Sequence, residues 1–169
     1  AYIAGGAVRD LIMGNTPHDY DIATNAHPEE IKSIFEKTID TGIKHGTVTV
    51  IENKTAYEVT TFRCDGEYGD NRHPIEVSYV NEPRTDCMRR DFTINAMAYS
   101  EEEGVVDYFE GQKDLERGVI RCVGNPMERF DEDALRVLRA LRFAGQLDFT
   151  IEENTVKAMK QQSIFLKDV

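Results

Sequence analysis

The sequence has 169 residues, of which 40% are hydrophobic and 30% charged, an ordinary composition for a globular protein. The formal net charge of −11 argues against a protein that binds nucleic acid through a generally basic surface. No apolar run approaches the roughly 20 residues that a membrane-spanning helix needs, so we expect no membrane partner. Three scattered cysteines, Cys64, Cys87 and Cys122, lack metal-site spacing and indicate reduced thiols in a cytoplasmic protein.

The basic residues are concentrated in two parts of the chain. The two groups are Arg84, Arg89 and Arg90, and then Arg129, Arg136, Arg139 and Arg142. A local positive groove on an acidic protein can hold a triphosphate, whereas broad contact with RNA would need further protein. The sequence starts within an apparent strand and stops in an unfinished amphipathic pattern, so we expect a longer protein.

The first stretch of interest is a pair of glycines between two regular elements. The apolar run Tyr2–Ala4 predicts a strand, and Val8, Leu11 and Ile12 predict a short helix that Gly14 ends. Gly5 and Gly6 lie between them. Glycines at such a turn let the backbone approach a phosphate, and the free N–H groups of the helix favour an anion.

A pair of aspartates follows this turn. On a strand, Asp19 and Asp21 point to the same side, because side chains alternate along a strand. Two adjacent carboxylates repel unless a cation lies between them. Mg²⁺ prefers oxygen ligands and also binds substrate phosphates. The pair therefore predicts a magnesium site. Either feature alone is more often structural, a simple turn or a solvated strand end.

The middle of the chain predicts a mixed succession of elements. A helix begins at Pro28, with Ile31, Ile34 and Phe35 as its buried face. Strands over residues 47–51 and 57–62 form a hairpin. If Val59 and Thr61 face one side, Glu58 faces the other, where it is a candidate third carboxylate beside the aspartates.

The remaining elements complete an α+β pattern. We predict a mobile surface loop over residues 64–74, a strand over 75–80 and helical spacing over 84–97. A strand over 105–109, a turn and short helix over 111–117 and a last strand over 119–123 follow. The Gly124-Asn125-Pro126 segment then breaks the pattern. We place a boundary there, with an α+β domain over residues 1–124 and a wholly helical region over 125–169.

Two later motifs carry groups that suit a nucleotide. The guanidinium of Arg90 suits phosphate oxygens, and the Asp91 carboxylate is able to accept a ribose hydroxyl. Asp133 and Arg136, three apart on a predicted helix, share a face with Arg139 nearby. Cytosine and adenine both present an amino donor beside a ring-nitrogen acceptor, which an Asp–Arg pair matches. The structural alternatives are a charged helix cap and an intrahelical ion pair worth about 0.2–0.5 kcal/mol.

Together these motifs resemble one enzyme family. Gly5–Asp10 with Asp19-x-Asp21-Ile22-Ala23-Thr24, the segment Arg89–Ala96 and the segment Glu132–Arg136 are similar to class II (bacterial-type) tRNA nucleotidyltransferases, the CCA-adding enzymes. Bacterial poly(A) polymerases are close relatives. The resemblance implies a polymerase-β-like head with a mixed sheet, followed by a helical neck.

The resemblance also implies a reaction and a set of site residues. The reaction is template-independent transfer of CMP and AMP from CTP and ATP to the 3′ end of tRNA, with Mg²⁺ as cofactor. Asp19, Asp21 and Glu58 are the implied catalytic residues, the two aspartates holding the metal. The implied phosphate ligands are Gly5, Gly6, Arg9 and Arg90, the ribose ligand is Asp91, and the base-recognition residues are Asp133, Arg136 and Arg139.

Several alternatives stay open. An A-adding enzyme or a poly(A) polymerase shares these motifs, although the strand ending at Arg63 lacks the basic run expected after it in poly(A) polymerases. A non-catalytic fragment that binds nucleotide or RNA is an alternative of another class. His18-Asp19 also suggests a metal-dependent phosphohydrolase, but the other histidines lie in no matching context. The oligomeric state is left open.

Overall fold

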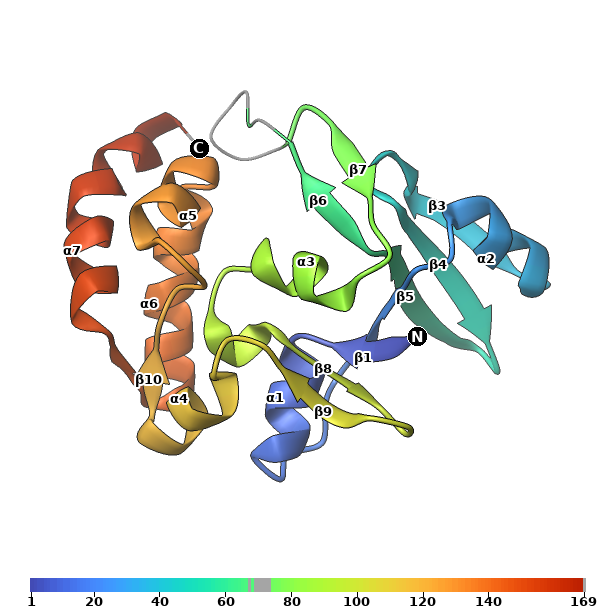
Figure 1. Cartoon of the computed structure of the whole chain (residues 1–169), viewed down its shortest axis with the longest axis horizontal. Helices are drawn as coiled ribbons and strands as arrows, with labels where there is room; N and C mark the ends of the chain where they lie inside the picture. The colour runs from blue at the N-terminus through green and yellow to red at the C-terminus, as the bar shows by residue number, and fades with distance from the viewer. Residues whose placement is uncertain (67, 69–73, 169) are drawn as a thin grey trace.

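A seven-stranded mixed sheet organises the first two thirds of the chain (Figure 1). The computed structural model describes residues 1–66, 68 and 74–168. Neighbouring strands run in the order β3-β4-β5-β2-β1-β8-β9. Their bounds are β1 Tyr2–Ala4, β2 Asp21–Thr24, β3 Thr38–Gly42, β4 Thr47–Glu52, β5 Thr55–Thr61, β8 Met97–Ser100 and β9 Gly104–Asp107.

The centre of the sheet fixes the positions of the N-terminal motifs. Strand β1 pairs antiparallel with both β2 and β8, whereas β2 pairs in parallel with β5. The hairpin between β4 and β5 is confirmed, with Asn53 and Lys54 at φ 50° and 66° in its turn. These left-handed conformations match the twist of a two-residue hairpin. The predicted strand over 75–80 is shorter, β7 Val77–Tyr79, and pairs with β6 Arg63–Asp65 in a separate sheet.

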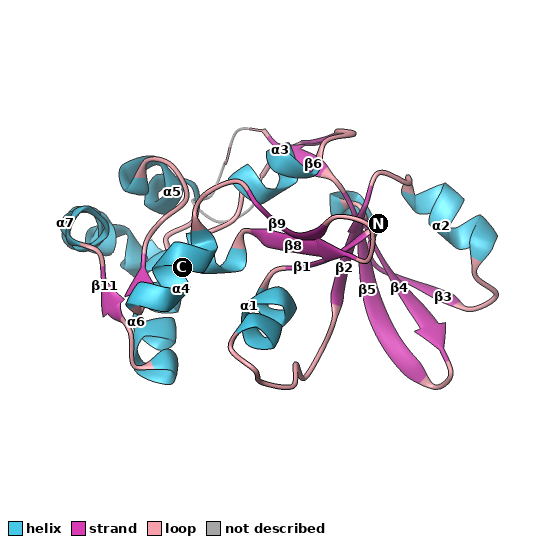
Figure 2. Cartoon of the chain, turned by 60° about the horizontal axis from the view of Figure 1, so that its bottom comes forward, coloured by secondary structure: helices cyan, strands magenta, loops and turns pink. Residues whose placement is uncertain are grey.

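Short helices connect and cover these strands. Helix α1 packs against β1 and β8, and α3 contacts β8 from a different side (Figure 2). The helices are α1 Gly6–Ile12, α2 Pro28–Ile34, α3 Pro83–Met88, α4 Gly111–Arg117, α5 Pro126–Glu132, α6 Leu135–Leu147 and α7 Glu153–Gln162, with 3₁₀ turns at Ile43–His45, Thr93–Asn95 and Ser163–Asp168. Within the described residues, no helix has both the length and the apolar content of a membrane span.

The structure corrects several local predictions. The helical spacing over 84–97 ends at Met88, and the chain then turns into β8, because Met97 and Ala98 are needed in the buried ladder with β9. Only Ile31 of the predicted α2 face is buried, whereas Ile34 is 69% and Phe35 36% exposed. Of the predicted loop over 64–74, residues 67 and 69–73 lie outside the described residues.

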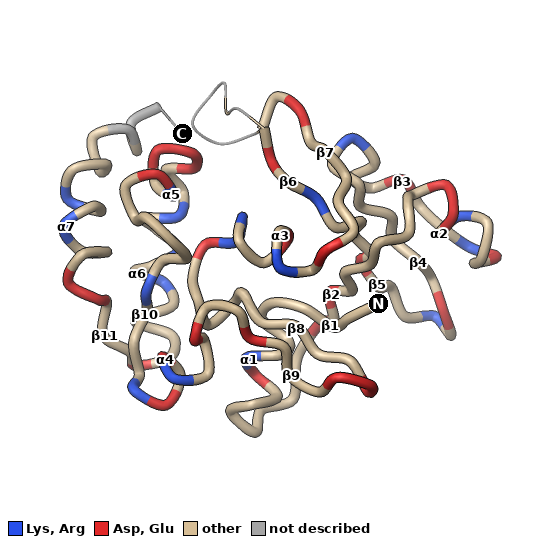
Figure 3. Tube along the Cα trace, in the orientation of Figure 1, with Lys and Arg blue, Asp and Glu red and all other residues tan. Residues whose placement is uncertain are grey.

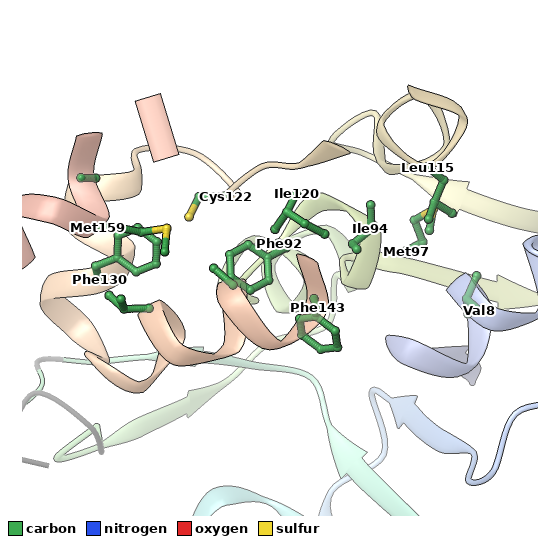
Figure 4. Close-up of a cluster of buried hydrophobic side chains, with 13 residues drawn as sticks. Val8, Phe92, Ile94, Met97, Leu115, Ile120, Cys122, Phe130, Phe143 and Met159 are labelled. Atoms are coloured by element: carbon green, nitrogen blue, oxygen red, sulfur yellow. The ribbon is translucent and has the colours of Figure 1, made fainter. Parts of the chain in front are cut away.

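The C-terminal part is helical apart from one short strand. Strand β11 Thr150–Ile151 pairs in parallel with β10 Val119–Ile120. The prediction that residues 125–169 are wholly helical is therefore wrong at this strand, which pairs with a strand that precedes residue 124. The largest buried cluster also joins the two parts (Figure 4). It unites Val8 and Phe92 with Phe130 and Phe143. The predicted α+β class with a mixed sheet and C-terminal helices is confirmed.

Candidate active site

A polar cavity of about 540 Å³ lies where α1, the start of β2, the Arg89–Asn95 segment and α6 meet. Six arginines and five aspartates line it. It contains every predicted site residue except Glu58: Gly5, Gly6, Arg9, Asp19, Asp21, Arg90, Asp91, Asp133, Arg136 and Arg139. Figure 3 shows basic positions on α3 and α6 and a run of acidic positions at the β8–β9 turn, so the charges are unevenly distributed over the elements.

The two aspartates lie at the beginning of β2. The prediction of one strand carrying both is wrong in detail, because the strand begins at Asp21 and Asp19 precedes it. Both carboxylates nevertheless line the cavity. Loss of solvation raises the pKa of Asp21; the charge of Arg90 opposes this rise and that of Asp19 adds to it. Carboxylates in this environment favour a bound cation.

Glu58 is adjacent to Asp21 in the sheet but does not line the cavity. Its Cα is the register partner of Asp21 across the parallel β2–β5 pair. In the described ranges, no group of three or more acidic, histidine or cysteine side chains is arranged to hold a metal ion. Two protein carboxylates suit Mg²⁺, which commonly takes one or two and completes its shell with water and substrate phosphate.

The glycine turn and Arg90 fit each other sterically. Gly5 has φ 71°, a conformation that L side chains rarely adopt, and its N–H donates to the Met97 carbonyl at 3.1 Å. A Cβ at Gly5 would lie 2.7 Å from Nη1 of Arg90. The missing side chain therefore lets the Arg90 guanidinium lie against the backbone at the cavity.

The carboxylate of Asp86 binds the side chains of two arginines that follow it in the chain, Arg89 and Arg90. Its buried carboxylate accepts from Nε of Arg89 at 2.9 Å and from Nη2 of Arg90 at 3.2 Å. The backbone N–H of Arg63 donates to it at 3.3 Å. Burial alone would raise the pKa of Asp86, but the charges and hydrogen bonds of both arginines outweigh burial and hold it below its usual value. Asp86 thus fixes Arg90 at the cavity.

Asp91 is the centre of a hydrogen-bond chain between α6 and α1. Its Oδ2 accepts from Nε of Arg139 at 2.7 Å, and its Oδ1 accepts from the Phe92 N–H at 2.7 Å and from Asn95 Nδ2 at 3.3 Å. Asn95 Oδ1 then accepts from Nη1 of Arg9 at 2.9 Å. An ionised carboxylate has about four acceptor positions, so Asp91 retains capacity for a ligand hydroxyl.

Arg9 is held at both ends of its guanidinium. Besides Asn95, it contacts Asp10, with Nε 2.8 Å and Nη2 2.7 Å from Oδ1. The side chain is 6% exposed. Such a fixed guanidinium fork needs little further ordering to bind an anion.

Asp133 and Arg136 do not share a helical face, contrary to the prediction. Helix α5 ends at Glu132, and Asp133 is extended at φ −143° and ψ 102°. Its Oδ1 accepts from the Leu135 N–H at 3.0 Å and so helps to begin α6. The short Asp side chain competes with the helix backbone at this point. The cavity nevertheless brings Asp133 and Arg136 together.

Arg136 joins three segments of the chain. Its Nη1 donates to the Arg129 carbonyl at 2.9 Å and to Glu132 at 2.6 Å, and its Nη2 donates to the Arg89 carbonyl at 2.9 Å. Burial by itself would lower the pKa of Arg136, but the Glu132 hydrogen bond and nearby negative charges raise it instead. Arg136 therefore also stabilises the wall that it lines.

Sequence reasoning placed Arg142 in the second basic group but not among the site residues, and it missed Phe143 and Gln146. A signal for Arg142 was present: Arg136, Arg139 and Arg142 recur every three residues, which places them along one side of a helix. No comparable signal marks Phe143, because an aromatic residue in an amphipathic helix is usually part of the core.

Comparison with known proteins agrees with this geometry. Residues 1–121 match the family model of the poly A polymerase head domain. The chain belongs to that family.

Relatives and solved structures extend the similarity over the whole chain. The CCA-adding enzyme of Ligilactobacillus salivarius is 52% identical over all 169 residues, and that of Streptococcus suis is 53% identical. The chain spans 42% of the length of each. The structure of the Bacillus stearothermophilus CCA-adding enzyme in complex with CTP is similar at TM-score 0.91 and 45% identity, covering 99% of this chain and 40% of that one. The Thermotoga maritima CCA-adding enzyme complexed with tRNA_CCA is similar at TM-score 0.77 and 30% identity, covering 99% and 39%.

Proposed function

We propose that the protein containing this chain is a CCA-adding tRNA nucleotidyltransferase, which transfers CMP and AMP from CTP and ATP to the 3′ end of tRNA and releases pyrophosphate. The observation that carries the proposal is the single cavity in which two aspartates meet several fixed arginines. The similarity to CCA-adding enzymes over the full chain supports it, including one solved with CTP and one with tRNA.

In this proposal, the triphosphate lies between the glycine turn and the arginines. Gly5 and Gly6 offer an open backbone, while Arg9 and Arg90 are already oriented by Asp10, Asn95 and Asp86. Charge-assisted bonds from guanidinium groups stabilise the charge that develops on the phosphate oxygens. The Asp91 carboxylate accepts a hydrogen bond from a ribose hydroxyl, which gives a preference for ribonucleotides over deoxyribonucleotides.

Asp19 and Asp21 are the proposed magnesium ligands. Their adjacent carboxylates at the cavity fit this ion, because Mg²⁺ needs few protein oxygens when phosphates supply the others. When bound, the ion lowers the pKa of the attacking hydroxyl and neutralises the triphosphate. Glu58 is the register partner of Asp21 in the sheet, and we propose that its carboxylate is a third acidic group beside the two magnesium ligands.

The proposed choice of base rests on Asp133, with Arg136 and Arg139 beside it. The carboxylate of Asp133 accepts from the amino group of cytosine or adenine, and a guanidinium donates to the ring nitrogen. Uracil and guanine carry an oxygen where cytosine and adenine carry the amino group. That oxygen and the Asp133 carboxylate are both acceptors, so no hydrogen bond forms between them. These residues belong to the proposed neck, residues 125–169, and the phosphate and metal groups to the proposed head, residues 1–124.

The deciding experiment uses nucleotide addition to tRNA with different 3′ ends, one labelled nucleotide at a time. The unmodified protein should add C and A in the order that completes CCA. Asp19→Asn and Asp21→Asn should each abolish addition while the protein stays folded. Asp131→Asn, an exposed aspartate of α5 outside the cavity, is the matched control. Full activity of either cavity variant would refute the metal assignment, and addition of A alone would favour a different member of the family.

A further inference from the structure

A buried carboxylate that the proposed reaction does not use lies on α4, outside the cavity. Asp114 is 4% exposed and is not among the residues that line the cavity. Its Oδ2 accepts from Oγ1 of Thr93 at 2.6 Å and from Nε of Arg121 at 2.9 Å. A buried carboxylate destabilises the fold unless it is paired and hydrogen-bonded, so Asp114 keeps both partners in place.

Thr93 is bound twice by this pair of residues. Its hydroxyl donates to Asp114, and its backbone N–H donates to the Arg121 carbonyl at 2.9 Å. Arg121 is itself anchored, because its Nη2 donates to the Phe109 carbonyl at 3.1 Å. The backbone and the side chain of Thr93 are therefore both fixed by groups outside the cavity.

Helix α4 approaches Thr93 closely because it begins with a glycine. A Cβ at Gly111 would overlap the Thr93 carbonyl oxygen and would lie 3.0 Å from Cγ of Met97. Figure 1 shows α4 beside β10, and α4 also contacts the 3₁₀ turn that begins at Thr93. The helix and the turn thus meet backbone against backbone, with no flexible side chain between them.

Thr93 lies midway between two residues that do line the cavity. Asp91 precedes it by two positions, Asn95 follows it by two, and Asn95 Nδ2 donates to Asp91 Oδ1 at 3.3 Å. The Val123 N–H also donates to the Asp91 carbonyl at 3.0 Å, so residues 91–93 are paired with residues 121–123 at both ends. A displacement at Thr93 therefore changes the position of the Asp91 carboxylate.

We propose that Asp114 is a positioning residue for ribose recognition: through the Thr93 hydroxyl it holds the turn that orients the Asp91 carboxylate. The inference rests on the proposed nucleotidyl transfer, in which Asp91 accepts the ribose hydroxyl. A binding group has to be held within about 0.5 Å of its productive position. A hydrogen bond outside the cavity is thus able to set the strength of a contact inside it.

The first test compares the binding of CTP and dCTP by the full protein with Thr93→Val. Because dCTP lacks the 2′-hydroxyl, the ratio of the dissociation constants for dCTP and CTP measures the ribose contact. Val has a similar shape to Thr but does not bind Asp114, which keeps its bond to Arg121. We expect the ratio to fall about tenfold, as for one lost hydrogen bond to a charged group.

Two further variants separate positioning from stability. Thr61→Val removes another fully buried hydroxyl, which donates to the Ala26 carbonyl at 2.8 Å, and is the matched control. It should lower the unfolding temperature and leave the dCTP to CTP ratio unchanged. Thr93→Ser keeps the hydroxyl and should keep the ratio. An unchanged ratio in Thr93→Val, or an equal fall in Thr61→Val, would overturn the inference.

The second test asks whether Asp114 acts through Thr93. Asp114→Ala should lower the ratio as Thr93→Val does, and the double variant should have the same ratio as either single variant. Such non-additivity indicates that the two residues act through one hydrogen bond. Additive falls in the ratio would contradict this route.

The two proposals fail in different ways. An unmodified protein that binds neither CTP nor tRNA would refute the proposed function and this inference with it. Equal binding of CTP and dCTP by the unmodified protein would refute the ribose role of Asp91 and therefore the inference. An unmodified protein that adds nucleotides and prefers CTP, together with an unaffected Thr93→Val variant, would refute only the inference.

Discussion

At the scale of single residues, the arginines of the cavity are held by buried or half-buried carboxylates. Asp86 anchors Arg89 and Arg90, Asp91 anchors Arg139, and Asp10 anchors Arg9. Long side chains lose much rotamer freedom when a ligand fixes them. Because these contacts fix the guanidinium groups before a ligand arrives, less ordering remains to be done on binding.

Asp86 makes this arrangement testable through stability. Its folded pKa lies below the ordinary value, so its contribution is present at neutral pH and is lost as the pH falls through the folded pKa. We expect Asp86→Asn to lower the free energy of unfolding by about 3 kcal/mol at pH 7, because it leaves two cations without their shared partner. The difference from the unmodified protein should shrink below about pH 4.

Urea unfolding at pH 7 and pH 3 measures both effects. Asp131→Asn should stay within about 0.5 kcal/mol of the unmodified protein at either pH, as for an exposed site. A difference for Asp86→Asn that is the same at both pH values would contradict the charge-based explanation.

Substitutions at two glycines distinguish the cost of backbone strain from the cost of a steric clash with Arg90. Gly5 and Gly14 both have positive φ, at 71° and 75°. A Cβ at Gly14 meets nothing within 4 Å, whereas at Gly5 it would lie 2.7 Å from Arg90. We expect Gly14→Ala to cost about 1 kcal/mol of stability and leave CTP affinity unchanged. Gly5→Ala should cost more and also weaken CTP binding. Equal CTP affinities in the two variants would show that the contact with Arg90 has no part in binding.

At the scale of elements, the break between α5 and α6 matters most. A continuous helix would project Asp133 and Arg136 from one face. Instead, the extended Asp133 lies in the junction and its Oδ1 binds the Leu135 N–H. One carboxylate oxygen therefore has a structural task, while the carboxylate as a whole remains at the cavity.

This division of tasks predicts different results for two substitutions of Asp133. Asn keeps an oxygen for the Leu135 N–H and replaces the other by an amino donor, so Asp133→Asn should retain stability but accept UTP or GTP relatively better. Asp133→Ala loses both carboxylate oxygens, including the one that binds the Leu135 N–H, and should lower the free energy of unfolding by about 1 kcal/mol. Competition among the four nucleotides and thermal unfolding measure these effects. An unchanged nucleotide ranking in a stable Asp133→Asn variant would exclude this side chain from base choice.

The elements also show what the sequence was able to predict. Local signals identified the glycine turn, α2 with its proline start, the β4–β5 hairpin and α4, since each depends on neighbouring residues. Strands β3 and β8 were missed because pairing across the sheet stabilises them, and local spacing carries no information about that pairing. The cavity residues were found as motifs, but Asp86 and Phe143 were not, since their roles arise from contacts between distant segments.

At the scale of the molecule, the core crosses the boundary proposed at residue 124. Phe130 of α5 and Met159 of α7 belong to the same buried cluster as Val8 of α1 and Ile94 (Figure 4). The parallel pair β10–β11 adds a second connection across it. The walls that α1, the segment from Phe92 and α6 give to the cavity thus rest on one continuous hydrophobic cluster.

A buried phenylalanine in the C-terminal part tests whether both parts unfold together. Phe130 is 0% exposed, so Phe130→Ala should lower the free energy of unfolding by about 3–5 kcal/mol. Phe35, 36% exposed after α2, is the matched control and should lose far less on substitution by Ala. Because the cluster is shared, we expect one unfolding transition and an equal loss of hydrogen-exchange protection in β8 and in α7. Loss of protection confined to α7 would instead mean that the boundary near residue 124 separates two folding units, and that the cavity forms only when they dock.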